Sequence, residues 1–333
     1  SFYSARINHK INIAKDKGAA GVILINESFN TWAPRIKNFF NRAGASLEEN
    51  DNDNFFAIHI PVKTADQLLS LNKSSVKKEQ KNAEKGNKES FTINANLTLK
   101  AEREYEVLPT TNVLGLIRGS EYPEEYLVIT SHYDHIGLID GQVNNGADDN
   151  ASGTSAVLEL ARVFAEAAKN GNPPKRSIIF MCVSGEEKGL LGSKWFTDYE
   201  PLVKLDNIVA NLNIDMIGRV DDLHKDNTNY VYLIGSDRLS LELHQISEET
   251  NRKYIQMDLD YTFNTENDPN RFYYRSDHYN FAKHNVPIIF YFNGVHEDYH
   301  KPSDTPDKIN YDLLAQRARL IFATAWVIAN AEE

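Results

Sequence analysis

Cysteine is nearly absent from this sequence of 333 residues, which contains only Cys182. A single cysteine excludes an internal disulfide. Because it lies in the apolar run IIFMCV, we interpret it as an inert core residue. Long hydrophobic runs are also missing, since none approaches the roughly 20 apolar residues that a membrane-spanning helix needs. We therefore predict no membrane span.

An excess of basic residues is missing as well. The 36 Lys and Arg residues are outnumbered by 47 Asp and Glu residues, and the formal net charge is −11. Nucleic-acid binding needs clustered basic side chains, so we expect no nucleic-acid partner. The one basic cluster, residues 73–88, is mixed with glutamate and indicates a solvated linker or helix end. The first ten residues, SFYSARINHK, show no signal-peptide pattern, which by itself does not place the protein in the cytosol.

The composition that remains, 41% hydrophobic and 25% charged, is typical of a globular protein with room for one large or two ordinary domains. The first part indicates a small α/β unit. Apolar spacing predicts a helix at residues 7–15 and strands at 22–25 and 55–62, followed by a helix at 64–72. The polar and aromatic stretch 27–54 contains EENDNDN, which we interpret as a surface loop.

From residue 91 onwards, strands alternate with helices. Alternating polarity predicts a half-exposed strand at residues 91–99. Apolar runs predict buried strands at TTNVLGLIRG, LVI, SIIFMCV, NIVANLNI, NYVYLIG and VPIIFYFN. Helical spacing predicts helices at 151–169, 190–199, 239–251 and 311–331. This alternation predicts an α/β fold, a three-layer sandwich with a mixed, largely parallel sheet.

Candidate metal ligands gather where the apolar strands end. Four strands are followed by His132, by Glu186 and Glu187, by Asp215 and by His300, and Asp149 precedes the helix after the first strand. Sites in open α/β sheets form outside the carboxyl ends of the strands, so we expect these side chains to meet. Two imidazoles and three carboxylates suit two zinc ions, each with an open position for water. A bridging carboxylate would hold the ions about 3.5–4 Å apart around one shared hydroxide.

These motifs resemble those of the M28 family of co-catalytic zinc aminopeptidases. The resemblance covers residues 91–333 and rests on SHYDH, GADDNASG, SGEE, NIDMIG and YHKPSDT, in that order. It implies a zinc exopeptidase-like fold and two zinc ions bound by His132, Asp149, Glu187, Asp215 and His300. Asp149 would bridge the ions, with His132 and Asp215 on one, and Glu187 and His300 on the other.

The resemblance also implies catalytic roles for three residues. Glu186 would be the general base, taking a proton from the bridging water and delivering it to the leaving amine. Asp134 would orient His132 through its second ring nitrogen. Tyr299 would donate a hydrogen bond to the tetrahedral oxyanion.

Four further residues near these motifs have no assigned role. We interpret Asp148 as a partner of loop backbone and His135 as a structural residue rather than a pocket residue. Asp277 and His278 lie in RSDHYNF, which resembles a family segment near the substrate pocket, but helix capping by Ser276 or Asp277 explains the pattern equally well.

The predicted function is therefore hydrolysis of the N-terminal peptide bond of peptide substrates, with zinc-bound hydroxide as the nucleophile. A carboxypeptidase, a dipeptidase or a one-zinc glutaminyl cyclase could use the same scaffold. A carboxypeptidase would need a cation beside the metals, for which Arg275 and Arg219 are candidates. A non-catalytic, receptor-type binding module should have lost a ligand or the base, and this sequence retains them all.

Residues 1–90 resemble the later part of a protease-associated (PA) domain followed by a linker, on the soft motifs GAAGVILIN and IPV. In PA-bearing members, this unit is inserted after the first helix and strand of the peptidase domain. We therefore expect the PA-like domain to be incomplete. Either the chain is a fragment, or processing has removed the missing elements, or an N-terminal fragment is a partner that completes the fold. Such members are generally exported, which implies a secreted or periplasmic protein.

Overall fold

The computed structural model describes residues 2–40, 44–47, 55–87, 90–100 and 106–332. The chain divides into two compact units, Ser1–Val107 and Leu108–Glu333. The segment 91–107, which the sequence assigned to the second domain, belongs to the first unit. Among the helices that these ranges contain, none is long and apolar enough to cross a membrane.

The first unit is built on two parallel strands. Strand β1 (Gly21–Asn26) pairs with β2 (Phe56–Pro61), and Ile23 lies opposite Ile58. The helices of this unit are α1 (Phe2–Asp16), α2 (Phe29–Phe40), α3 (Val62–Ser70) and α4 (Val76–Glu84). The predicted strands and the predicted helices corresponding to α1 and α3 are confirmed. The identity of this unit as a PA-like domain remains a prediction.

Three local predictions in this unit differ from the structure. Part of the stretch 27–54 forms α2, which Pro34 inside the helix made hard to foresee because proline removes a helical hydrogen bond. The basic cluster contains a whole helix, α4, whose first turn is capped by Ser75. The predicted strand at 91–99 is wrong: these residues form neither helix nor strand, and all but Ile93 are exposed. Its polarity alternates, but no neighbouring strand pairs with it. The EENDNDN run lies outside the described residues.

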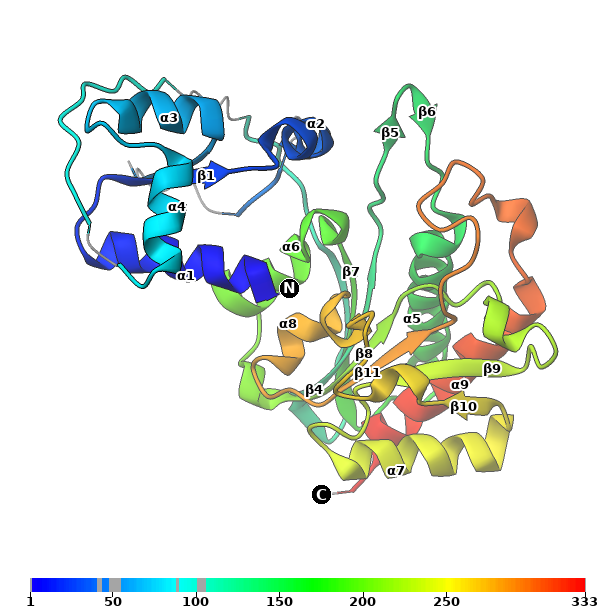
Figure 1. The fold of residues 1–333 in the computed structure, drawn as a ribbon. Coiled ribbons are helices and arrows are strands. Elements are labelled where there is room, and N and C mark those ends of the chain that lie inside the picture. The colour runs from blue at the N-terminus through cyan, green and yellow to red at the C-terminus, as the bar shows by residue number, and fades with distance from the viewer. Residues whose placement is uncertain (1, 41–43, 48–54, 88–89, 101–105, 333) are drawn as a thin grey trace. The chain divides into compact units, whose positions relative to one another are not determined.

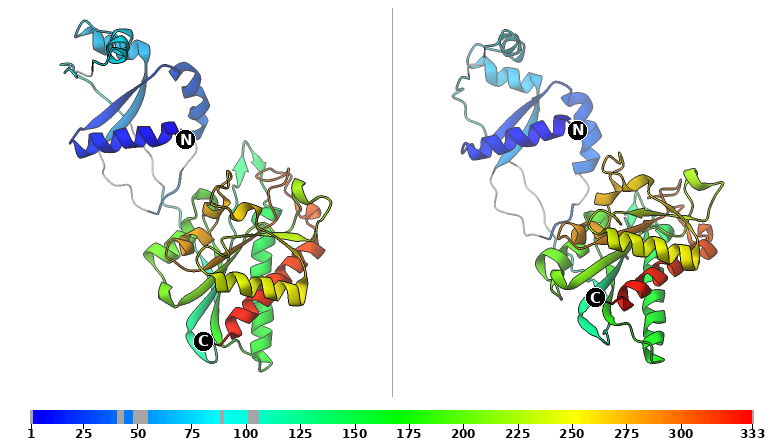
Figure 2. Two further views of the ribbon diagram at one scale, coloured as in Figure 1. Left: turned by 60° about the horizontal axis from the view of Figure 1, so that its bottom comes forward. Right: turned by 90° about the horizontal axis from the view of Figure 1, so that it is seen from below.

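The second unit is a three-layer sandwich around a seven-stranded sheet, with the order β10-β9-β11-β8-β4-β7-β3 (Figures 1 and 2). Only β9–β11 and β3–β7 pair antiparallel, so the predicted mixed, largely parallel sheet is confirmed. The strands are β3 (Val113–Ile117), β4 (Tyr122–His132), β7 (Arg176–Val183), β8 (Ile208–Ile214), β9 (Tyr230–Ile234), β10 (Asp258–Asp260) and β11 (Ile288–Phe292). A separate hairpin joins β5 (Leu138–Ile139) and β6 (Gln142–Val143).

Helices cover both faces of this sheet. They are α5 (Gly153–Lys169), α6 (Leu191–Lys194), α7 (Leu241–Thr250), α8 (His278–Ala282) and α9 (Tyr311–Asn330). Figure 1 shows α5 and α9 side by side against the sheet, and their apolar residues share one core with Leu127 and Ile129 of β4. Val128 points the other way and packs with Phe281 of α8. Each fully buried side chain of this size stabilises the fold by about 1.5–3 kcal/mol, so both faces hold β4 in the middle of the sheet.

Candidate functional site

The predicted ligands lie at one edge of the sheet. Strands β4, β7, β8 and β11 are parallel neighbours, so their carboxyl ends open on the same side. His132 is the last residue of β4, and Asp215 directly follows β8. Glu186 and Glu187 form a turn just after β7. The structure brings these residues together with Asp149 and His300.

The loop that carries Asp149 is packed too tightly for larger residues at its glycines. A Cβ on Gly146, whose φ is +62°, would lie 2.3 Å from the Asp149 carbonyl oxygen and 2.7 Å from the ring of His135. A Cβ on Gly153, the first residue of α5, would lie 2.5 Å from the carbonyl oxygen of Ile214 in β8. These two glycines in GADDNASG therefore let the loop approach the ends of β4 and β8 closely.

Asn150 fixes the same loop. Its side-chain amide donates hydrogen bonds to the Ser131 hydroxyl (3.0 Å) and the Ile214 carbonyl (2.9 Å). Its side-chain oxygen accepts from the backbone amides of Gly153 and Met216. The peptide bond between Asp149 and Asn150 is cis. Asp149 is thus anchored from two strands and one helix.

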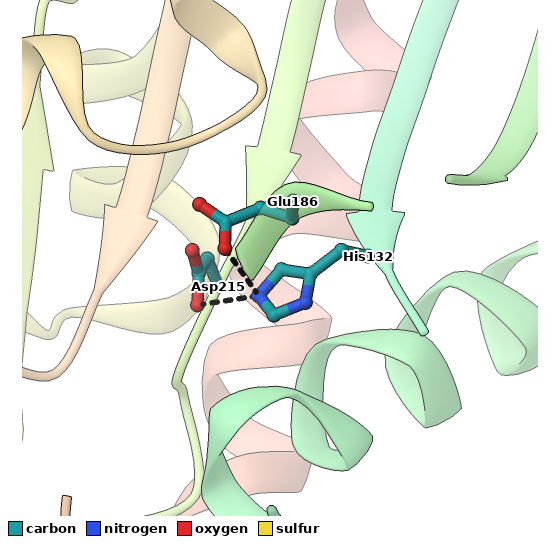
Figure 3. A group of neighbouring side chains, drawn as sticks. All are labelled: His132, Glu186 and Asp215. Carbon is teal, nitrogen blue, oxygen red and sulfur yellow. Dashed lines mark ion pairs between the residues drawn. The ribbon is translucent and has the colours of Figure 1, made fainter. Parts of the chain in front are cut away.

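The first cluster of the site surrounds His132, whose side chain is buried (Figure 3). Its Nε2 lies 3.3 Å from Asp149 Oδ1 and 3.5 Å from Asp215 Oδ1. Glu186 Oε2 lies 4.0 Å from the same nitrogen, and Figure 3 shows both the Glu186 and the Asp215 carboxylates directed at it. Ser276, which the sequence suggested only as a helix cap, donates its hydroxyl to Asp215 Oδ2 at 2.6 Å.

The second cluster lies on the other oxygen of Asp149. His300 Nε2 is 3.0 Å from Asp149 Oδ2 and 3.3 Å from Glu187 Oε2. The two carboxylate oxygens of Asp149 thus face different imidazoles. This is the arrangement that a carboxylate bridging two ions requires.

His135 belongs to this second cluster, contrary to the structural role that we assigned to it. Its Nδ1 lies 2.9 Å from Glu187 Oε1 and 3.9 Å from Asp149 Oδ2. Its ring lies edge-on to the ring of His300, with 5.8 Å between the centroids. The signal available in the sequence was its position three residues after His132, within the same motif.

Asp134 acts differently from the expectation. The backbone carbonyl of Asp134 accepts the hydrogen bond from His132 Nδ1 at 3.0 Å, whereas the Asp134 carboxylate lies 3.8 Å from that nitrogen. That carboxylate instead accepts from the backbone amides of Glu186 (3.1 Å) and Glu187 (3.4 Å). Asp134 therefore orients the imidazole with its backbone and the two-glutamate turn with its side chain.

Asp148 and Asp304 support the loop from behind. The fully buried Asp148 accepts from the Gly218 amide at 2.6 Å and lies 3.1 Å from His296 Nε2, which agrees with its predicted backbone role. Asp304 accepts from the backbone amides of both Asp148 and Asp149. This contact was not predictable from local sequence patterns because the partners are about 155 residues apart.

Asp277 and His278 are buried beside the site but belong to neither cluster. Asp277 accepts from the Ser193 hydroxyl at 2.5 Å and makes no capping bond to α8. Burial raises its pKa to about 7. His278 Nε2 bonds the Tyr273 carbonyl at 2.8 Å, and burial lowers its pKa to about 3. Neither residue caps the helix with its side chain.

Tyr299 lies next to His300, and the two rings stack with 3.9 Å between their centroids. Its hydroxyl accepts a hydrogen bond from Arg275 at 3.3 Å. Burial, followed by the nearby Asp149 carboxylate, raises its pKa, so the phenol keeps its proton at neutral pH. Tyr299 is therefore available as a hydrogen-bond donor beside the clusters.

The electrostatics of the site are governed by its carboxylates. Burial raises the pKa of Glu186 well above its ordinary value. Burial lowers the pKa of His300, but hydrogen bonds to Asp149 and Glu187 outweigh it and raise that pKa to about 9. Burial also lowers the pKa of His132, but the carboxylates of Asp215, Asp149 and Glu186 together outweigh it and raise that pKa well above its usual range. Both imidazoles thus hold protons that a divalent cation would displace.

The residues present fit a pair of divalent cations. His132 Nε2 makes no hydrogen bond of good geometry although three carboxylates lie within 4.0 Å, and both ring nitrogens of His135 are likewise unsatisfied. Buried polar atoms without partners are rare in proteins unless an ion or water serves them. Two groups have ligand atoms within 4.8 Å of one another: His132, Glu186 and Asp215, and His135, Asp149 and Glu187.

Comparison with known proteins agrees with this geometry. Residues 112–325 match the model of peptidase family M28. Aminopeptidase YwaD of Bacillus subtilis is 28% identical over 257 residues, which cover 72% of this chain and 52% of that protein. A probable glutamate carboxypeptidase of Arthroderma benhamiae is 35% identical over 150 residues, 44% of this chain and 18% of that protein.

The structure of BSAP, a zinc aminopeptidase from Bacillus subtilis, matches with a TM-score of 0.54 and 25% identity, covering 66% of this chain and 50% of that one. The chain thus spans about half or less of the length of these relatives. The matched residues 112–325 include every residue of the two clusters. From this match, we conclude that the chain belongs to peptidase family M28.

Proposed function

We propose that this protein is an aminopeptidase that binds two zinc ions and removes the N-terminal residue of peptides. One observation carries the proposal: the two oxygens of Asp149 face separate imidazole and carboxylate groups, each built from the carboxyl ends of parallel strands. The similar protein BSAP is a zinc aminopeptidase and the similar protein YwaD is an aminopeptidase, and both similarities support the proposal for this chain.

In the proposed site, His132, Asp215 and Asp149 hold one ion. Glu187, His300 and Asp149 hold the other, and His135 orients Glu187. When bound, the ions would polarise the scissile carbonyl and acidify a water molecule. The acidic cluster as a whole would attract the free α-amine of the substrate, which suits removal of an N-terminal residue.

The protein's own groups would then move the protons. Glu186, whose side chain is 11% exposed, takes a proton from the attacking water and passes it to the leaving amine. The Asp134 carboxylate holds the Glu186 backbone for this role. The Tyr299 hydroxyl donates a hydrogen bond to the oxyanion of the tetrahedral intermediate.

The test combines zinc content with hydrolysis of leucine p-nitroanilide. We expect Glu186→Gln to retain zinc and lose about 10²–10⁴-fold in kcat, the usual contribution of a general base. Glu242→Gln, an exposed glutamate in the first turn of α7, is the matched control and should behave as wild type. Full turnover by Glu186→Gln would refute the mechanism. Release of C-terminal residues alone would refute the aminopeptidase assignment.

A carboxypeptidase would need a free cation beside the ions. Arg219 does not supply one because it is paired with Asp298 at 3.0 Å. Arg275 lines the same pocket as three carboxylates of the site, so the release of N-terminal or C-terminal residues decides between the two activities.

We also propose that the first unit is a PA-like domain and that the protein is secreted or periplasmic. The family resemblance supports both proposals. Fractionation of the source cells, with detection of the chain in each compartment, tests the second proposal.

A further inference from the structure

A pocket opens beside the proposed metal site, and both acidic and basic side chains line it. Three carboxylates of the site line it, those of Asp149, Glu186 and Asp215. Its walls are apolar and include Phe272, Phe290 and Phe292. Arg275 and Tyr299 complete the lining. A ligand in this pocket therefore meets acids at the reacting centre, aromatic rings along its length and one guanidinium.

Arg275 is held in place without being neutralised. Its guanidinium carbon lies 4.9 Å from the centroid of the Phe272 ring, and its terminal nitrogen donates to the Tyr299 hydroxyl at 3.3 Å. The Phe272 ring carries no charge, and the Tyr299 phenol keeps its proton because its pKa is raised. Among the described residues, no carboxylate lies within ion-pair distance, 4.0 Å, of Arg275. Stacking and one hydrogen bond orient the side chain but leave most of its donors available.

The other arginines nearby are used differently. Arg219 is paired with Asp298, and the fully buried Arg317 donates to the backbone carbonyls of Tyr230, Ile217 and Arg219. Arg238 donates to the carbonyls of Asn264 and Thr265. Unlike these three, Arg275 lines the pocket and has exposed surface.

We propose that Arg275 binds a carboxylate of the substrate and thereby sets specificity. The planar guanidinium matches a carboxylate in a two-bond geometry, and its stacked orientation reduces the entropy lost on binding. This inference rests on the proposed function, because the acids and ions of the metal site must hold the scissile bond. The carboxylate can come from an acidic N-terminal side chain or from the C-terminus of a dipeptide.

Two matched substrate pairs separate these sources. Leu-Leu and Leu-Leu-amide differ only in the C-terminal carboxylate, and Glu-Leu-amide and Gln-Leu-amide differ only in the side-chain carboxylate. For each pair the measured quantity is the ratio of kcat/KM for the carboxylate substrate to that for the neutral one. We expect Arg275→Ala to lower this ratio about tenfold or more for at least one pair, the effect of a lost charge-assisted hydrogen bond. The affected pair identifies the source.

The control variants are chosen from the same segment. Arg275→Lys keeps the charge but not the two-bond geometry, so its ratio should fall between those of wild type and Arg275→Ala. Arg271→Ala removes an exposed arginine that stacks on Tyr274 and does not line the pocket, and its ratio should equal that of wild type. A ratio that Arg275→Ala leaves unchanged for both pairs overturns the inference.

Failure of the proposed function has a different signature. If wild-type protein hydrolyses none of the four peptides, the aminopeptidase assignment fails, and calorimetric titration of the same peptides into the full zinc-loaded chain decides the inference. Tighter binding of a carboxylate peptide than of its neutral partner, lost in Arg275→Ala, supports it. Equal affinity within both pairs, or no binding by wild type, overturns it.

Discussion

Two imidazoles compete for one position in the second cluster. His300 approaches both Asp149 and Glu187, whereas His135 is within 3.5 Å of Glu187 alone. We therefore expect His300→Ala to lose one zinc ion per chain. His135→Ala should keep both but bind the second about 10–100-fold more weakly, as when a residue that orients a ligand is removed. Elemental analysis after dialysis and competition with a chelator measure the two effects.

The exposed His9 of the first unit provides the control, since His9→Ala should change neither quantity. If His135→Ala loses an ion while His300→Ala retains two, the two histidines exchange roles, and the ligand set inferred from the motif order is incorrect. Either outcome leaves the first cluster unaffected because His132 contacts neither ring.

The residues that sequence alone could identify are those attached to a strong local signal. His132 and Asp215 come at the ends of apolar strands, so their positions followed once the strands were recognised. His135 sits in an irregular loop, where the direction of a side chain is not set by a period of two or 3.6 residues. Asp304 and Ser276 act through contacts with residues distant in sequence, and nothing near them in the chain indicates those partners.

At the scale of the elements, one partly exposed ion-pair group links the chain just after α6 to the chain just after α8. Asp198, four residues beyond the end of α6, accepts from Lys283 at 2.6 Å and from His284 at 2.7 Å, both just after α8. Burial raises the Asp198 pKa, but these hydrogen bonds outweigh it and lower the pKa to about 2. The Asp198 side chain is 24% exposed. Solvent therefore partly screens its ion pairs, which stabilise the fold less than fully buried pairs of the same geometry would.

We expect Asp198→Asn to lower the free energy of unfolding by about 1–2 kcal/mol at pH 7. Because the folded-state pKa lies below the unfolded value of about 3.9, this contribution is complete above that pH and is lost as the pH falls towards 2. Urea unfolding of both proteins at a series of pH values measures the difference. An equal difference at pH 6 and pH 2.5 would contradict the linkage, and Asp206→Asn, an exposed aspartate, is the control.

Helices and strands were predictable where burial requires a regular pattern of apolar residues. All eight residues of β7 are buried, and its continuous apolar run is what a strand covered on both faces requires. The three-residue strand β10 is too short to show an alternation of apolar and polar residues, and it was not predicted. Residues 91–99 show that a pattern alone is not enough. Their alternating polarity favours a strand, but a strand forms only when a neighbouring strand pairs with it.

At the scale of the whole molecule, the alternation of strands and helices predicted the layers but not the order of the strands. The position of β11 between β8 and β9, parallel to one and antiparallel to the other, depends on how the chain returns after α8. Yet the site was predictable without that order. Every parallel strand ends at the same edge, so ligands at four such ends meet in any arrangement that keeps the strands adjacent.

The site lies entirely in the second unit, so zinc binding should raise the stability of that unit. All residues of both clusters lie within Leu108–Glu333, so zinc should stabilise that unit alone. A ligand that binds only the folded state at 100 times its Kd contributes about 2.7 kcal/mol. For a unit of this size, each kcal/mol raises Tm by about 2–4 °C, which predicts a shift of roughly 5–10 °C. Scanning calorimetry of the intact chain with zinc and with chelator measures it.

The bridging role of Asp149 makes this measurement selective. Replacing Asp149 with asparagine removes a ligand common to both proposed ions, so the difference in Tm between the zinc and chelator samples should largely disappear in Asp149→Asn. Replacing Asp215, which contacts the first cluster alone, should leave a smaller but measurable difference. Equal zinc-dependent shifts in wild type and Asp149→Asn would mean that zinc binds elsewhere, because no other residue faces both clusters with separate oxygens among those that the structure describes.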